Sequence, residues 1–295
     1  MVLVAGSTGM VGGEICRILA RKGQKVRALV RPSADQVSVQ ALVEAGVEIA
    51  EGDVREPRSL ERACKGVRNV ISTVSSMPTR YRAGDNDLSS VDDRGTKNLA
   101  DAARAARAES FVLVSFPGDV SFPLHDAKRE AERYLQASKL TWTILYPTFF
   151  TEVWLSALVG FDFGKASVRL YGTGENAVSF VSFRDVAAVA AAGPDLEKNS
   201  VVPIFGPQAL RPNRVVKMFE EAAGAAFAVE RIPEAALAAQ FQQATDPMQK
   251  SFAALMLGIA GGDGTGSAPS QPWHGMKMRT VGQYIRDMVP QGVPR

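Results

Sequence analysis

Short apolar segments alternate with helix-like stretches along the first half of the chain. The apolar segments lie at residues 2–5, 26–30, 47–50, 70–74, 111–115 and 141–146, and helical patterns occupy residues 12–22, 37–45, 57–65, 92–108 and 126–138. This alternation predicts βαβ crossovers, and therefore a mostly parallel sheet with helices on both faces. Near-continuous apolar runs are typical of strands buried on both sides. We therefore expect an α/β fold with a doubly wound parallel sheet.

The pattern changes after residue 147. Residues 178–183 alternate apolar and small polar side chains, and helical patterns follow at residues 185–192, 213–223, 234–245 and 247–260. We expect a first domain at residues 1–150 and a smaller, mainly helical substrate-binding region at residues 151–295, with part of 175–206 returning to the sheet. The glycine-rich stretch 261–272 is either a mobile connector or a lid over a pocket.

Composition narrows the possible functions. The 295 residues are 46% hydrophobic and 22% charged, as in ordinary globular proteins, and the net charge of +3 is too small to indicate a nucleic-acid partner. Cys16 and Cys64 neither form a disulfide framework nor have metal-ligand spacing. The chain begins without a signal-peptide pattern, and its apolar runs are far shorter than the ~20 residues of a membrane helix. We expect a cytoplasmic monomer or homodimer that binds a small-molecule substrate and no metal, membrane or nucleic acid.

The strongest chemical signal is the glycine-rich segment between the first strand and the first helix, which reads Gly6-Ser7-Thr8-Gly9-Met10-Val11-Gly12. In this context Gly6 permits a tight turn, Gly9 lets the backbone approach a pyrophosphate, and Gly12 lets the helix pack closely on the strand. The phosphates would rest on the helix N-terminus. We therefore predict an NAD(P)-binding Rossmann domain with all seven residues at the cofactor. The alternative is a glycine-rich turn without a ligand.

The next strand ends carry further candidate cofactor contacts. Arg31 follows the second strand, where an acidic residue suits the ribose hydroxyls of NAD and an arginine suits the 2′-phosphate of NADP. Arg31 therefore favours NADPH over NADH, unless it is a solvated loop arginine. Asp53 and Val54 follow the third strand, where Asp53 either accepts a hydrogen bond from the adenine amino group or caps the helix that begins near Pro57.

The fourth strand ends in the small residues Thr73-Val74-Ser75. In an open parallel sheet, ligands bind at the carboxyl ends of the strands, so this segment faces the same crevice as the glycine-rich turn. Small residues there let the chain pass close to a cofactor, although small residues also simply end strands. We count all three residues among the candidate cofactor contacts.

Several motifs together resemble a known family. Besides the glycine-rich segment, these are Gly52-Asp53-Val54, Gly95-Thr96-Lys97-Asn98-Leu99, Asp126-Ala127-Lys128 followed by Glu132, Thr143-Ile144-Leu145-Tyr146-Pro147 and Phe183-Arg184-Asp185-Val186-Ala187. Their order and spacing are similar to the NmrA-like branch of the atypical short-chain dehydrogenase/reductases, over about residues 2–192. That branch includes quinone, phenylpropanoid-ether and dye reductases as well as inactive NADP sensors. The resemblance therefore implies the fold and an NADP cofactor, but not the substrate.

The resemblance also implies the catalytic residues. Typical members use a Tyr as acid or base and a Lys that lowers its pKa; here Lys128 matches the lysine and Leu124 stands at the Tyr position. NmrA-like reductases share that loss and rely on the lysine, so the resemblance assigns a catalytic and cofactor-contacting role to Lys128. Ser115, at the end of the fifth strand, matches the usual catalytic serine.

The helix pattern around Lys128 provides a separate argument. Ala127, Ala131 and Leu135 form the apolar stripe of this helix, and Lys128 lies one position off that stripe, from which it could reach the cleft. A cation in a first helical turn opposes the helix dipole, and such local conflicts gather at functional sites. The alternative is a solvated surface lysine.

Neighbouring polar residues of the same helix carry weaker signals. His125 could donate a proton near neutral pH, but we expect a solvent-exposed residue at the start of the helix. The other charged positions fit a solvated helix face: Arg129, Glu130, Glu132 and Arg133.

The segment after the sixth strand is a candidate boundary of the substrate pocket. By resemblance, Tyr146, Pro147 and Phe149 run past the nicotinamide and count as cofactor contacts. The nearby aromatic residues either wall an apolar pocket or fill the seam between the two halves of the chain: Phe150, Trp154, Phe161 and Phe163. We expect Asp185 to be structural and to cap the helix that follows it.

These features lead to one preferred function and one alternative from a different class. The preferred function is an NADP-dependent oxidoreductase that transfers a hydride to a small apolar carbonyl, quinone or similar electrophile, with Lys128 assisting proton transfer or orienting the nicotinamide ribose. The alternative is a catalytically silent NADP-binding sensor, which the missing Tyr allows. A sugar-nucleotide epimerase fits less well, because such relatives keep the Tyr.

Overall fold

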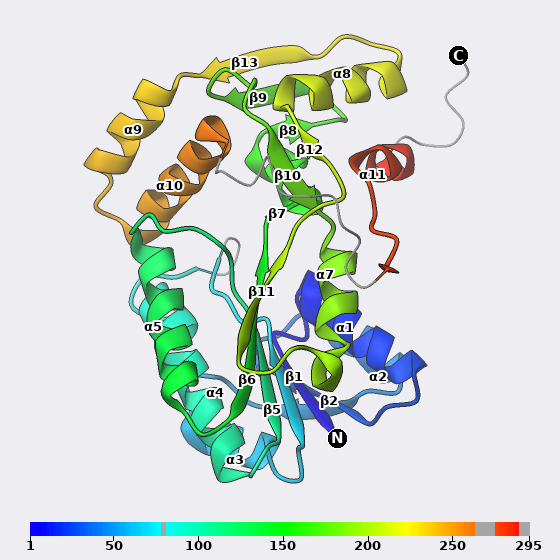
Figure 1. Cartoon of the computed structure of the whole chain (residues 1–295), viewed down its shortest axis with the longest axis vertical. Helices are drawn as coiled ribbons and strands as arrows, with labels where there is room; N and C mark the ends of the chain where they lie inside the picture. The colour runs from blue at the N-terminus through cyan, green and yellow to red at the C-terminus, as the bar shows by residue number, and fades with distance from the viewer. Residues whose placement is uncertain (78–80, 263–274, 289–295) are drawn as a thin grey trace. The chain divides into compact units, whose positions relative to one another are not determined.

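The computed structural model describes residues 1–77, 81–262 and 275–288. Its internal contacts divide the chain into two compact units, which are described separately below (Figure 1). Unit 1 comprises Met1–Tyr146 and Val186–Pro203, and unit 2 comprises Pro147–Asp185 and Ile204–Arg295. Within the described ranges, no helix combines the length and the apolar character that crossing a membrane requires.

Unit 1 is built on a seven-stranded parallel sheet with the strand order β11-β6-β5-β4-β1-β2-β3. The strands are β1 (Val2–Ala5), β2 (Val26–Val30), β3 (Glu48–Glu51), β4 (Asn69–Ser72), β5 (Ser110–Val114), β6 (Thr141–Pro147) and β11 (Ser200–Ile204). The chain crosses from β3 to the far side of β1 when it forms β4, so the sheet is doubly wound. This arrangement confirms the predicted fold class.

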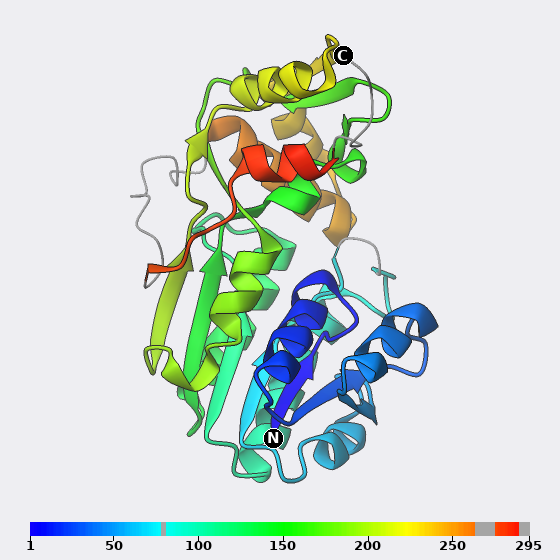
Figure 2. The same cartoon turned by 90° about the vertical axis from the view of Figure 1, so that its right-hand side faces the viewer.

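Helices cover both faces of this sheet, with α3, α4 and α5 on one face (Figure 1) and α1, α2 and α7 on the other, which is turned toward the viewer in Figure 2. Their bounds are α1 (Met10–Arg21), α2 (Gln36–Glu44), α3 (Pro57–Ala63), α4 (Arg94–Ala105), α5 (Pro123–Ala137) and α7 (Phe183–Ala190). A π-helical segment, η1 (Leu88–Asp93), precedes α4, and a short 3-10 segment, η3 (Gly193–Asp195), precedes β11.

One core cluster of unit 1 lies between the sheet and the helices α3, α4 and α5, and residues of α1, α2 and α7 are buried on the other face. Leu3, Phe111 and Ile144 from the strands are fully buried against Leu99 of α4 and Leu135 of α5. Burial on both sides explains why the central strands read as continuous apolar runs.

Unit 2 contains two small sheets together with helices. One sheet has the strand order β12-β10-β7 and the other β13-β9-β8. The strands are β7 (Phe149–Phe150), β8 (Phe161–Asp162), β9 (Ser167–Tyr171), β10 (Val178–Val181), β12 (Ala209–Leu210) and β13 (Ala228–Ile232). The helical segments are α6 (Thr151–Trp154), η2 (Ala157–Val159), α8 (Pro212–Ala223), α9 (Glu234–Gln243), α10 (Pro247–Gly261) and α11 (Val281–Met288). Of these strands, β10 was predicted from the sequence, and β9 also alternates buried apolar residues with more exposed ones.

Candidate functional site

The glycine-rich turn connects β1 to α1 at the carboxyl edge of the sheet. Gly6 has a φ of +79°, a left-handed conformation that favours glycine. A Cβ at Gly12 would lie 2.3 Å from the carbonyl oxygen of Gly6, so any side chain there would push the helix off the turn. Ser7 fixes the turn from inside, because its buried hydroxyl donates to the carbonyl of Leu29 at 2.8 Å.

The N-terminus of α1 is open to a ligand. Gly9 occupies the N-cap position, no side chain caps the helix, and its first turn contains no acidic residue. Gly9 and Met10 are exposed, and Thr8 and Val11 are partly exposed. Uncapped first-turn N–H groups together with the helix dipole suit a pyrophosphate. The residues present therefore fit a dinucleotide, and the contacts of Thr8, Gly9, Met10 and Val11 with it remain predictions.

The end of β4 lies directly beside the glycine-rich turn, because β4 pairs with β1. Thr73 donates from its hydroxyl to the carbonyl of Ala5 at 3.1 Å, and a Cβ on Gly6 would collide with that hydroxyl at 2.5 Å. Val74 is buried and Ser75 is exposed. Two of the predicted segments, the glycine-rich turn and residues 73–75, thus meet at one sheet edge.

Lys128 is buried beneath this edge. Its side chain is 5% exposed, and Nζ donates to the carbonyl oxygen of Val74 at 2.7 Å. Nζ also lies 3.0 Å from Oδ1 of Asp92, a fully buried carboxylate of η1, in an ion pair without the alignment of a hydrogen bond. The other oxygen of Asp92 accepts from the backbone N–H and the hydroxyl of Ser76. Lys128 is therefore not a solvated surface lysine.

Two neighbours of Lys128 on α5 are also buried. Leu124, at the position of the missing Tyr, is 6% exposed. His125 is 9% exposed, with Nδ1 at 2.9 Å from Asp126 and Nε2 at 3.1 Å from the carbonyl oxygen of Gly118. The expectation that His125 is solvent-exposed is therefore wrong. It packs between Phe116 and Phe122, which are the apolar residues of the loop that enters the helix.

Ser115 belongs to a polar cluster centred on Glu132. Its hydroxyl donates to Oε1 of Glu132, and Tyr146 donates to Oε2 at 2.6 Å. Arg129 forms an ion pair with the same carboxylate and lies over the ring of Tyr146, 4.7 Å from its centroid. Burial raises the pKa of Tyr146, and the hydrogen bond to Glu132 raises it further, so this phenol stays protonated at neutral pH.

The interpretation of α5 as having a solvated charged face is therefore only half right. Glu130 and Arg133 are exposed and pair with one another, whereas Glu132 is 3% exposed and faces the sheet. Lys128 and Glu132 lie four positions apart, which places both on one helix face. That spacing is the signal that could have identified Glu132 from the sequence.

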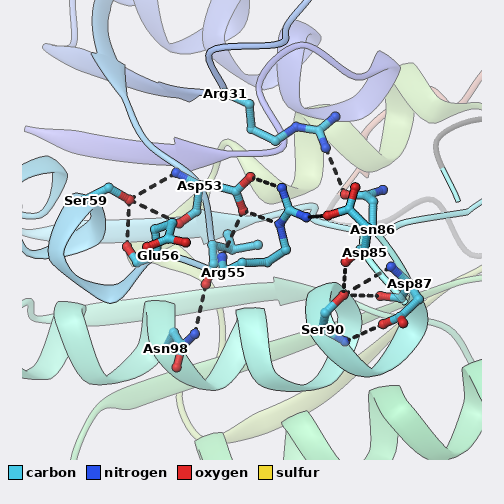
Figure 3. A network of polar contacts seen from close by, with 11 residues as sticks. Arg31, Asp53, Arg55, Glu56, Ser59, Asp85, Asn86, Asp87, Ser90 and Asn98 are labelled. Carbon is cyan, nitrogen blue, oxygen red and sulfur yellow. Dashed lines mark hydrogen bonds and ion pairs between the residues drawn. The ribbon is translucent and has the colours of Figure 1, made fainter. Parts of the chain in front are cut away.

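A second polar network joins the ends of β2 and β3 (Figure 3). Arg31 donates from Nη1 to Oδ1 of Asn86 at 2.8 Å. Asp53 holds Arg55 through two bonds, Nε to Oδ1 at 3.0 Å and Nη2 to Oδ2 at 2.7 Å. Arg55 also donates to Asp85, which precedes Asn86 in the connection between β4 and η1. The sequence reading missed Arg55, Asp85 and Asn86, because their contacts join segments far apart in the chain.

Asp53 faces Arg55 rather than a helix end. Helix α3 has Glu56 at its N-cap without a side-chain cap, so the alternative in which Asp53 caps this helix is wrong. Burial alone would raise the pKa of Asp53, but hydrogen bonds from Arg55 and the charges of Arg55 and Arg31 outweigh it and hold the pKa below its ordinary value. Asp53 is thus an anion at neutral pH. Its contact with an adenine, like that of Val54, remains a prediction.

Unit 1 also has a surface pocket of about 500 Å³ beside this network. Its lining contains none of the residues of the glycine-rich turn and consists of Arg55, Ser90, Arg94, Lys97, Asn98 and Tyr134. Lys97 already pairs with Asp93 at 2.6 Å, and Arg55 is held by Asp53 and Asp85. Two of the three cations in this lining, Arg55 and Lys97, are therefore already paired with carboxylates.

The remaining predicted residues belong to unit 2. Pro147 and Phe149 are the first residues of this unit, and their contact with a cofactor remains a prediction. Phe161 and Phe163 pack with Phe219 and Phe227, so they contribute to the core of unit 2. The carboxylate of Asp185 accepts from the backbone N–H of Arg279 at 2.8 Å, which is a structural contact. The prediction that Asp185 caps the helix after it is wrong, because α7 begins at Phe183 and Asp185 lies in its first turn.

Comparisons with known proteins agree with this geometry. The sequence model of the NmrA-like family matches residues 1–264. The NAD(P)H azoreductase of Xenophilus azovorans is 32% identical over 230 residues, which cover 76% of this chain and 74% of that protein. The photosystem II assembly factor Ycf39 of Cyanophora paradoxa is 29% identical and covers 80% of this chain and 73% of its own.

Solved structures share the whole fold. An NADPH-dependent quinone oxidoreductase from Escherichia coli, determined in complex with NADPH, superimposes with a TM-score of 0.76. The match covers 98% of this chain and 99% of that one at 20% identity, a level that shows the fold alone.

Proposed function

Because this chain belongs to the NmrA-like family, we propose that it is an NADP-dependent oxidoreductase that transfers a hydride to a small apolar carbonyl, quinone or similar electrophile. The observation that carries this proposal is the buried ammonium group of Lys128 at the carboxyl end of β4, one strand away from the open N-terminus of α1. A cation held at a strand end of this sheet is placed to act on a ligand bound there.

The proposed cofactor contacts follow the strand ends. The glycine-rich turn and the N–H groups of α1 bind the pyrophosphate, and Arg31 binds the 2′-phosphate of the adenosine ribose. Asp53 and Val54 lie at the adenine, and residues 73–75 pass close to the dinucleotide. Tyr146, Pro147 and Phe149 complete the predicted set by resemblance to the family.

Lys128 has donors to spare for chemistry. An ammonium group has three N–H donors, and within residues 1–77, 81–262 and 275–288 only the carbonyl of Val74 accepts a hydrogen bond from it. NADPH, when bound, supplies the hydride. Lys128 donates to the nicotinamide ribose or to the oxygen that becomes negative as the electrophile is reduced, and the ion pair with Asp92 holds the lysine in place.

Ser115 has a secondary role in this proposal. Its hydrogen is already donated to Glu132, so the oxygen offers lone pairs to a substrate rather than a proton. Tyr146 is likewise committed to Glu132. Proton transfer therefore falls to Lys128 or to water.

The test is an assay of NADPH consumption with a panel of quinones, azo dyes and aldehydes. The readout is the loss of NADPH absorbance. Turnover with one member of the panel is expected. The double variant Lys128→Met/Asp92→Asn, which keeps the site neutral, should then lose about 10²–10⁴-fold in rate, the range of general acid–base catalysis. Full activity of that variant would exclude Lys128 as the catalytic residue.

A catalytically silent NADP-binding sensor is the second candidate. It is favoured by Leu124, a buried apolar side chain where a proton-donating Tyr would stand, and by the committed hydroxyl of Ser115. A sensor would bind NADPH but oxidise it with no member of the panel. The same assay therefore separates the two functions.

A further inference from the structure

The network at the ends of β2 and β3 contains the carboxylate of Asp85, an anion that the protein itself supplies to Arg55. Arg55 lies between two carboxylates, those of Asp53 and Asp85 (Figure 3). Arg31 contacts the side chain of the following residue, Asn86. Two neighbouring residues of the connection between β4 and η1 therefore supply a partner to each of the two arginines at this sheet edge.

The charges of the two arginines and of the two aspartates nearest to them cancel. Arg31 and Arg55 contribute two positive charges, and Asp53 and Asp85 contribute two negative charges. The charge of Arg31 is partly shared with Asp53, because it helps to lower the pKa of that carboxyl group. An arginine pair without Asp85 would carry a net positive charge, which favours a phosphate more than it favours a hydroxyl group.

We propose that Asp85 is a specificity-determining residue, whose carboxylate occupies Arg55 as an internal anion and thereby reduces the preference for NADPH over NADH. The inference rests on the proposed function, because it places the adenosine ribose at Arg31. A 2′-phosphate is a dianion near neutral pH and must compete with Asp85 for the guanidinium donors. A 2′-hydroxyl carries no charge and meets no such competition.

The geometry makes this competition feasible. The side chains of Asp85 and Arg55 are 58% and 30% exposed, so a ligand from solvent can reach the pair. The backbone around Asp85 is held independently of its carboxylate, because Asp87 and Ser90 form a capping box and Ser90 donates to the carbonyl of Asp85 at 2.6 Å. Replacing the carboxylate therefore removes a charge without removing the turn.

The test is the variant Asp85→Asn, with dissociation constants for NADPH and NADH measured by fluorescence titration. The NADPH constant should fall about threefold to fivefold, the size of a partly exposed ion pair, and the NADH constant should stay within about twofold. Glu109→Gln is the matched control: Glu109 is 57% exposed and pairs with Arg68, but it precedes β5 at the amino edge of the sheet. This control should change neither constant.

The outcomes separate the two proposals. If the unsubstituted protein binds both dinucleotides but Asp85→Asn leaves their ratio unchanged, or shifts it toward NADH, then the role of Asp85 is overturned and the proposed function stands. If the unsubstituted protein binds neither dinucleotide, the proposed function fails and this inference fails with it. The fold of Asp85→Asn is checked by thermal unfolding. A midpoint temperature close to that of the unsubstituted protein shows that the variant is folded.

Discussion

Lys128 and Asp92 form an ion pair in which both side chains are buried, with 3.0 Å between Nζ and Oδ1. Asp92 comes from η1 and Lys128 from α5, so the pair connects two segments on one side of the sheet. The same lysine holds the carbonyl of Val74 at the end of β4. Its removal therefore affects stability as well as chemistry.

Lys128→Met should cost about 3–5 kcal/mol of unfolding free energy, because it leaves the carboxylate of Asp92 buried without its cation. Lys128→Met/Asp92→Asn should recover much of this loss, since an asparagine oxygen can still accept from Ser76. Urea unfolding of the two variants measures the difference. Equal stabilities would contradict the ion pair.

Ser115→Ala should reduce kcat/KM by at most about tenfold, because the serine hydrogen is already donated to Glu132. This reduction is well below the loss expected for the lysine variant. Ser110→Ala is the matched control, since Ser110 lies at the opposite end of the same strand and donates to Asn69. A loss for Ser115→Ala as large as that for the lysine variant would make Ser115 the proton donor.

The strands of unit 1 were predictable because burial on both faces leaves a continuous apolar run, as in β1 and β5. The helix containing Asp92 was expected to begin at that residue. It begins at Leu88, because Asp87 and Ser90 cap the chain earlier. In unit 2 the two-residue strands β7, β8 and β12 are too short to show a period, so they could not be predicted.

The site was predictable where backbone geometry dictates the residue type, as at Gly6 and Gly12. It was not predictable where charges pair across the fold. Glu132 looked like a surface residue, since charged residues on a helix are usually solvated. The hydroxyls of Ser115 and Tyr146 and the guanidinium of Arg129 make its burial tolerable. The contact of Arg55 with Asp85 depends on how the loop after β4 returns to β3, which no local pattern encodes.

Gly12→Ala should abolish dinucleotide binding and destabilise the protein by about 1–3 kcal/mol, because its Cβ would lie 2.3 Å from the carbonyl oxygen of Gly6. Gly282→Ala in α11 is the control: its Cβ would meet nothing closer than 3.6 Å. Alanine there should be neutral or stabilising, as expected for a helical position with free space. Thermal unfolding with and without NADPH measures both effects, and binding retained by Gly12→Ala would contradict close packing of helix and turn.

Asp53 should make the stability of the protein sensitive to acid. Its pKa is lower in the folded protein than the ordinary value of 3.8, so its contribution is present above that pH and is lost as the pH falls through the folded value. Asp53→Asn should therefore be less stable than the unsubstituted protein at pH 7, and this difference in stability should become smaller toward pH 3. Thermal unfolding across this range tests the sign; a difference that grows in acid would refute it.

We propose that the carboxyl edge of the unit 1 sheet binds NADPH, with the glycine-rich turn at the pyrophosphate and Arg31 at the 2′-phosphate. The most direct measurement is a paired fluorescence titration of the unsubstituted protein and Arg31→Ala with NADPH and NADH. We expect the unsubstituted protein to prefer NADPH, and Arg31→Ala to lose about tenfold in NADPH affinity, as expected for one charge-assisted contact, with little change for NADH. Equal losses for both dinucleotides would contradict the role of Arg31, and binding of neither by the unsubstituted protein would contradict the site as a whole.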